Sequence, residues 1–177
     1  MFGGIGCNVV NPAITARVFM LVAFGSMTKQ AFPTVVDTVA GATPLATEGG
    51  LAEAKLLDLF IGLKGGAIGE VSALALLIGF VYLVVRRVIH FETPLVYIGT
   101  VFLGALIITG SPLVALYHVL AGGLLIGAIF MATDYVTSPA TPAGKIIFGL
   151  GAGLLTFLIR YYGSYPEGVS FAILLMN

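Results

Sequence analysis

Six apolar segments, separated by shorter polar connections, most constrain what this chain can fold into. They run over about residues 9–25, 66–85, 94–108, 113–131, 146–159 and 168–177. A helix of about 20 apolar residues crosses the hydrocarbon core of a bilayer. Only 9% of the residues are charged, whereas soluble domains carry about a quarter. We therefore predict an all-α fold, a polytopic membrane helix bundle of about five full spans plus a truncated sixth, with glycine-broken helices.

The connections define the expected organisation of the bundle. We expect one transmembrane domain over residues 1–177, and we expect a fragment, because the last apolar segment is too short to span a bilayer. Residues 26–64 form the longest polar connection. Within it, residues 51–63 carry leucine and phenylalanine at helical spacing, which predicts an amphipathic helix in the interface. Gly110-Ser111-Pro112 predicts a tight turn before the fourth span.

The distribution of basic residues suggests an orientation. Arg86, Arg87 and Lys145 would lie on one side of the membrane. The opposite side would carry Lys29, Lys55, Lys64 and Arg160. The adjacent arginine pair closely follows a span, and such charges favour the cytoplasm. This predicts that the 26–64 connection is an extracytoplasmic loop.

Several classes of site are disfavoured by composition and spacing. A net charge of zero argues against nucleic acid, which selects a basic surface. Cys7 is the single cysteine, and His118 has no histidine or carboxylate three or four residues away, so we predict no metal site. The run Gly149-Leu-Gly-Ala-Gly153 lacks the third glycine of a dinucleotide fingerprint, and close helix packing explains it better. No catalytic residue is assigned.

Two features in the apolar part allow both a structural and a functional interpretation. Asn11-Pro12-Ala13 resembles the helix-initiating box of water channels, but that fold needs two such boxes, so a cap with proline in the first turn is the preferred interpretation over a pore or cofactor role. Arg17, Glu70 and Glu167 are charges in or beside apolar segments. On one interpretation, these charges lie at the headgroup level or form ion pairs. On the other, glycine-broken helices present them to a cofactor or an ion.

The stretch Asp-Thr-Val-Ala-Gly-Ala-Thr-Pro-Leu-Ala, residues 37–46, displays the hydroxyl of Thr43 among small residues. Gly41 and Ala42 leave the backbone open to approach, and Pro44 stiffens the chain directly after Thr43. From the residues alone this stretch is compatible with an ordinary turn. It is also compatible with a modification site that a second enzyme can grip.

Five segments together resemble the D subunit of the Rnf complex, a relative of the B subunit of the sodium-translocating NADH:quinone oxidoreductase. They are Gly3–Ala13, Asp37–Ala46, Gly66–Ala75, Met131–Pro139 and Ile159–Asn177, in the family's order. The resemblance covers nearly the whole chain and corresponds to roughly the C-terminal half of the Rnf protein. It places the chain in a bacterial or archaeal plasma membrane, with other Rnf complex subunits as partners.

The resemblance implies electron transfer between ferredoxin and NAD, coupled to sodium or proton transport. It further implies FMN joined covalently through its phosphate to a threonine by a flavin transferase. The family's attachment pattern, Asp-x-x-Ser/Thr-Gly-Ala-Thr, aligns with Asp37, Gly41, Ala42 and Thr43, so Thr43 is the expected attachment site. Ala40 departs from the pattern, because a serine or threonine stands there in the family.

A second flavin, such as riboflavin, is also implied by the resemblance, and Arg17 and Glu70 are candidates for contacting it. The main alternative is a small-solute channel or transporter without a redox cofactor, suggested by Asn11-Pro12-Ala13 and by the charges within apolar segments. A purely structural membrane scaffold is a third hypothesis. The Asp37–Thr43 pattern favours the electron carrier, because a plain channel has no use for it.

Overall fold

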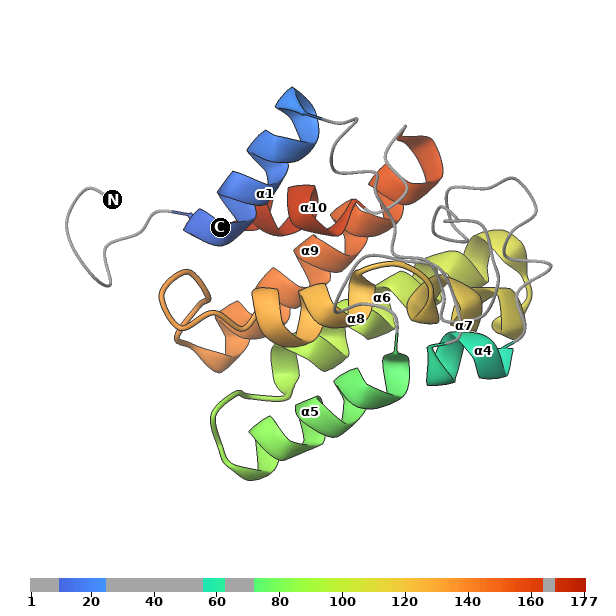
Figure 1. Ribbon diagram of the computed structural model, residues 1–177, viewed down its shortest axis with the longest axis horizontal. Coiled ribbons are helices and arrows are strands. Elements are labelled where there is room, and N and C mark those ends of the chain that lie inside the picture. Colours follow the sequence, from blue (N-terminus) through green and yellow to red (C-terminus); the bar gives the residue numbers. More distant parts are fainter. Residues whose placement is uncertain (1–9, 25–55, 63–71, 164–167) are drawn as a thin grey trace.

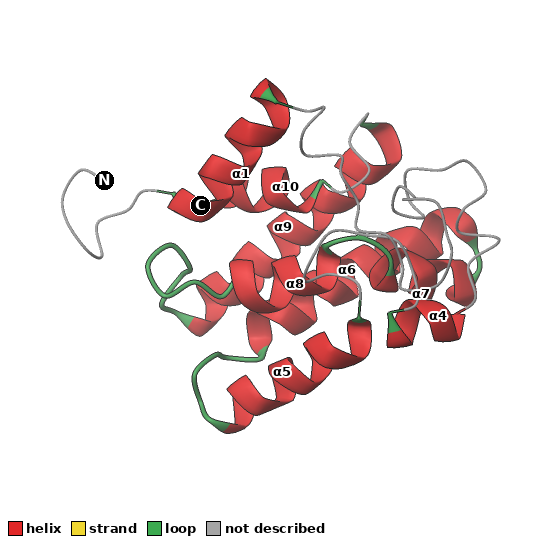
Figure 2. Ribbon diagram, in the orientation of Figure 1, coloured by secondary structure: helices red, strands yellow, loops and turns green. Residues whose placement is uncertain are grey.

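The computed structural model describes residues 10–24, 56–62, 72–163 and 168–177. Every element in these ranges is helical, as Figure 2 shows, so the prediction of an all-α fold is confirmed for the described residues. Two helices, α6 (Glu92–Thr109) and α9 (Pro142–Tyr162), are long and apolar enough to cross a membrane. They pack side by side in the centre of the molecule (Figure 1).

Shorter helices surround this central pair. On one side lie α1 (Pro12–Ala23) and α10 (Val169–Met176), which contact each other, and α10 also packs on α9. On another side lie α5 (Ala73–Val85) and the short α4 (Leu56–Ile61) (Figure 1). Both α1 and α5 are apolar but have 12 and 13 residues in the described range. The number of about five full spans therefore stays a prediction.

The fourth apolar segment, predicted as one span of a bundle with glycine-broken helices, forms two helices. The first, α7 (Pro112–Leu120), and the second, α8 (Leu124–Ile126) with the π-helix Gly127–Met131, meet at an angle of 68°. Counted as one span, this bent pair gives the described residues a third candidate crossing. The bend follows from Gly122, whose φ of +69° lies in the left-handed region that other residues avoid.

Helix ends follow the local sequence rules. The Asn11 side chain accepts hydrogen bonds from the backbone N–H groups of Ala13 (3.0 Å) and Ile14 (3.3 Å), and Pro12 opens α1. The structure thus supports the helix-cap interpretation of the Asn-Pro-Ala box. The predicted turn before α7 is confirmed, since Gly110 ends α6 with φ +63° and Pro112 begins α7.

Glycines allow the two central helices to approach closely, as the run from Gly149 to Gly153 predicted. A Cβ atom added to Gly149 would lie 2.9 Å from the Thr93 carbonyl oxygen, and one added to Gly153 would lie 2.9 Å from the Tyr97 carbonyl oxygen. The backbones of α6 and α9 are therefore in close contact, and the two helices run parallel. Small residues serve this purpose in membranes, where the hydrophobic effect between helices is absent.

Candidate functional site

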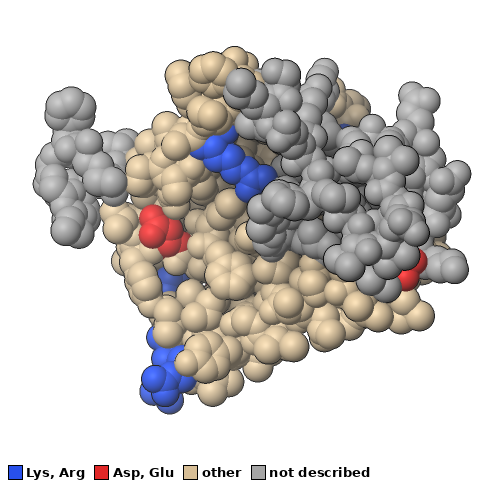
Figure 3. Space-filling model, viewed as in Figure 1, with Lys and Arg blue, Asp and Glu red and all other residues tan. Residues whose placement is uncertain are grey.

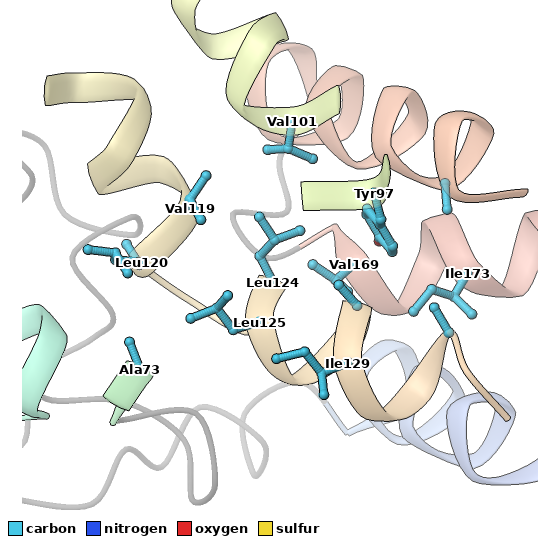
Figure 4. Packing of buried hydrophobic residues seen from close by; sticks show 14 of the residues in the cluster. Ala73, Tyr97, Val101, Val119, Leu120, Leu124, Leu125, Ile129, Val169 and Ile173 are labelled. Atoms are coloured by element: carbon cyan, nitrogen blue, oxygen red, sulfur yellow. The ribbon is translucent and has the colours of Figure 1, made fainter. Parts of the chain in front are cut away.

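The bend between α7 and α8 is the most unusual element of the described chain. Ala121, Gly122 and Gly123 connect the two helices and are all buried. Ala121 and Leu124 have no exposed surface. Figure 4 shows that Leu120, Leu124 and Leu125 at the bend belong to the same apolar cluster as Val169 and Ile173 of α10. A helix is therefore interrupted inside the core, where its backbone groups need protein partners.

Arg160, near the end of α9, supplies one of these partners. Its Nη1 donates a hydrogen bond of 2.6 Å to the carbonyl oxygen of His118, in the last turn of α7. The backbone N–H of Ala121 donates to the Tyr117 carbonyl oxygen at 2.8 Å. The last carbonyls of a helix have no partner within it, and they carry the negative end of its dipole. The Arg160 guanidinium thus complements both the hydrogen-bonding and the charge at the end of α7.

Aromatic and hydroxyl groups surround this contact. The Tyr161 ring lies 5.9 Å from the His118 ring and 5.2 Å from the Phe157 ring, measured between centroids. One turn earlier on α9, the buried Thr156 Oγ1 lies 2.6 Å from the Tyr97 hydroxyl oxygen of α6. The polar groups of α9 therefore fasten it to α7 and to α6. The sequence predicted neither the contact of Arg160 with α7 nor that of Thr156 with α6.

Close packing holds the second half of the broken helix. A Cβ atom added to Gly127 would overlap Val169 Cγ1. The π-helix begins at this glycine, and single π turns within helices are frequent at functional sites. Within the described residues, no group of three histidines, cysteines or carboxylates could hold a metal ion. The arrangement offers the Arg160 guanidinium, two half-helix ends and buried hydroxyl groups, all of which can form hydrogen bonds with a polar group.

Comparison with known proteins supplies the context for this site. The sequence of residues 1–177 matches the NQR2, RnfD, RnfE protein family. The chain belongs to this family. It is 49% identical to the D subunit of the Na(+)-translocating ferredoxin:NAD(+) oxidoreductase complex of Acetobacterium woodii, over 99% of this chain and 56% of that protein. It is 44% identical to the proton-translocating counterpart of Clostridium ljungdahlii, over 99% of this chain and 58% of that protein.

The chain is also similar to a B subunit of the NADH-quinone reductase. The B subunit of the Na(+)-translocating NADH-quinone reductase of Azotobacter vinelandii is 38% identical, over 100% of this chain and 48% of that protein. The chain thus spans about half to three-fifths of the length of the curated relatives that it matches. The resemblance to the D subunit of the Rnf complex is confirmed at the level of the family.

The described residues include one of the predicted site residues. Arg17 lies half-buried on α1, which packs against α10. The other five, which are Asp37, Gly41, Ala42, Thr43 and Glu70, lie outside the described residues. Their roles therefore stay predictions, as does the extracytoplasmic placement of residues 26–64. The bend at Gly122 had one signal in the sequence, a glycine pair inside an apolar run.

Proposed function

We propose that this chain is part of a membrane subunit of an ion-translocating ferredoxin:NAD oxidoreductase complex. In this role it carries electrons on a covalently bound FMN and couples their transfer to ion transport. The observation that carries the proposal is the family match over residues 1–177. The names of its relatives include both a sodium-translocating and a proton-translocating complex, so the proposal leaves the ion open.

The attachment site in this proposal is Thr43. Its side chain supplies a hydroxyl, the group that a phosphoester to FMN requires, and Asp37, Gly41 and Ala42 complete the pattern around it. When bound, FMN supplies an isoalloxazine ring that accepts and passes on electrons. A covalent bond retains the flavin during turnover. A flavin transferase and the other subunits of the complex are the partners that this role demands.

The bent pair α7–α8 supports a role in transport. Interrupted helices in membrane proteins place backbone dipoles and charges where a cofactor or an ion passes. Arg160 of α9 is such a charge, and its hydrogen bond to the His118 carbonyl oxygen places it beside the end of α7. A channel without a redox cofactor would also use an interrupted helix, so the bend does not separate the two functions. The flavin does.

A denaturing gel tests the proposal directly. The full-length protein, produced in a host that has the flavin transferase, should give a band with flavin fluorescence. Thr43→Val should abolish the fluorescence, because no hydroxyl remains to form the ester. Thr38→Val, a matched control in the same stretch, should leave the band fluorescent.

Two results would count against the proposal. A fluorescent Thr43→Val band would move the attachment to another residue. A dark wild-type band would favour the channel or the scaffold, and a solute-flux assay in vesicles would then distinguish these. Ala40→Thr restores the family's hydroxyl at that position, and it should raise the fraction of chains that carry flavin.

A further inference from the structure

A cavity of about 270 Å³ lies at the end of the bundle where α5 ends and α9 begins. Two connections border it, residues 86–91 between α5 and α6 and residues 132–141 before α9. The Tyr135 hydroxyl donates a hydrogen bond to the carbonyl oxygen of Val88, which ties the two connections together. The cavity is therefore bordered by two segments that lie far apart in the sequence.

The cavity is lined by one cation and several hydrogen-bond donors. Its polar lining consists of His90, Thr93, Thr133, Tyr135, Ser138 and Lys145. Lys145 is half-buried in the first turn of α9, and no carboxylate among the described residues forms an ion pair with it. An ammonium group beside hydroxyl groups suits an anion with several acceptor oxygens, such as a phosphate.

The surrounding charges favour the same sign of ligand. Arg86 and Arg87 are exposed at the end of α5, and Figure 3 shows basic side chains gathered at that corner of the molecule. Two carboxylates, Glu92 and Asp134, lie next to lining residues in the sequence but are not part of the lining. Glu92 lies 3.8 Å from His90, between Oε2 and Nδ1, while Asp134 accepts from Thr137 Oγ1 at 3.1 Å. Neither carboxylate lines the cavity, so a cation is a poor occupant.

The position of the cavity along the helices indicates the source of the phosphate. The two candidate spans α6 and α9 both begin beside it, at the level where a bilayer has its headgroups. Leu95 on α6 and Ile146 and Ile147 on α9 are exposed within the first two turns of these helices. Such apolar surface next to a cationic cavity suits a molecule with a phosphate head and acyl chains. A free phosphate would leave that surface unused.

We propose that this cavity binds the headgroup phosphate of an anionic phospholipid, with Lys145 as its principal cation. Arg86 and Arg87 add attraction from the rim. Basic pockets between membrane helices bind anionic headgroups in this manner. The lipid would fasten the beginnings of α6 and α9 to the connection that follows the π-helix.

Native mass spectrometry of the purified full-length complex tests the proposal. Titration with phosphatidylglycerol and with phosphatidylcholine of identical acyl chains gives two apparent dissociation constants. We expect preference for phosphatidylglycerol. Lys145→Met should weaken phosphatidylglycerol binding more than about fivefold, which is the effect of one basic side chain that merely lies near a lipid surface. Lys145→Arg should keep the preference, because it keeps the charge.

The matched control is Arg86→Gln, which removes a charge at the same end of the bundle but outside the cavity lining. It should weaken binding much less than Lys145→Met. Equal losses in the two variants would indicate general surface charge and overturn the site. Unchanged lipid preference in Lys145→Met would overturn it as well.

A third arm separates the two sources of phosphate. Inorganic phosphate alone should not give a mass peak for a bound phosphate, and it should not displace phosphatidylglycerol. Displacement that depends on Lys145 would assign the cavity to a free anion and overturn the lipid. If Lys145→Met fails to assemble, judged by gel filtration, Ser138→Asp places a negative charge in the cavity. That variant should lose the preference for phosphatidylglycerol, and an unchanged preference would refute the proposal.

Discussion

The contact between α6 and α9 predicts opposite effects of the same substitution at two glycines. Gly153 of α9 faces α6, and a Cβ added there would lie 2.7 Å from Thr100 Cβ and 2.9 Å from the Tyr97 carbonyl oxygen. Gly99 of α6 has no atom within 4 Å of an added Cβ. Gly153→Ala therefore forces two helices apart, whereas Gly99→Ala does not. Both substitutions place alanine in a helix interior.

The magnitude depends on the atoms that must move. A carbonyl oxygen inside a helix cannot rotate away, so relief requires a shift of α6 relative to α9 by a few tenths of an ångström. Overpacking of this kind costs roughly 1–3 kcal/mol. Alanine regains about 0.5–1 kcal/mol over glycine in a helix. This gain is common to both variants and cancels, so their free energies of unfolding should differ by about 1–3 kcal/mol.

Titration with sodium dodecyl sulfate of the full-length protein in a mild detergent gives the free energy of unfolding. Gly153→Ala should unfold at lower denaturant than the wild type, and Gly99→Ala at equal or higher denaturant. Equal stabilities of the two variants would refute the packing described for α6 and α9. So would a larger loss in Gly99→Ala, because the structure leaves open space at that position.

Two further predictions concern hydrogen bonds. A double-mutant cycle of Tyr97→Phe and Thr156→Val should give a coupling of about 0.6 kcal/mol, typical of side-chain hydrogen bonds in membranes, and additive losses would contradict the 2.6 Å contact. Asn11→Ala should lower the free energy of unfolding by about 1 kcal/mol because α1 loses its cap, whereas Asn11→Ser keeps a cap acceptor and should lose less. Equal losses in the two Asn11 variants would assign the effect to the weaker bond from Asn11 to Asp134, at 3.5 Å.

Local sequence patterns predicted the helices and several of their ends. Apolar runs become helices because a helix satisfies its own backbone hydrogen bonds. Asn11 caps α1 through a short-range contact that sequence spacing encodes. Gly110 and Pro112 likewise fix the turn between α6 and α7 through their own backbone preferences. Where a feature depends on neighbours along the chain, its residues therefore predict it.

Features that depend on distant segments could not be predicted in this way. Tyr97 and Thr156 are 59 positions apart, and Arg160 reaches a carbonyl oxygen 42 positions away. From the sequence alone, Arg160 is only a charge to be assigned to one side of the membrane. The carbonyl oxygen that accepts its hydrogen bond cannot be identified without knowing how α7 and α9 pack. The cavity at Lys145 likewise depends on two connections that lie far apart in sequence.

The bend in the fourth apolar segment links these observations. Residues 113–131 are apolar enough to be taken for one span, because hydropathy records side chains and ignores backbone direction. The chain turns by 68° at the left-handed Gly122, and the interruption leaves the last carbonyl groups of α7 without partners in a continuing helix. Arg160 supplies a donor to one of them. The end of α7 at the bend thus depends on Arg160, since an apolar residue at position 160 would leave the His118 carbonyl oxygen without this donor.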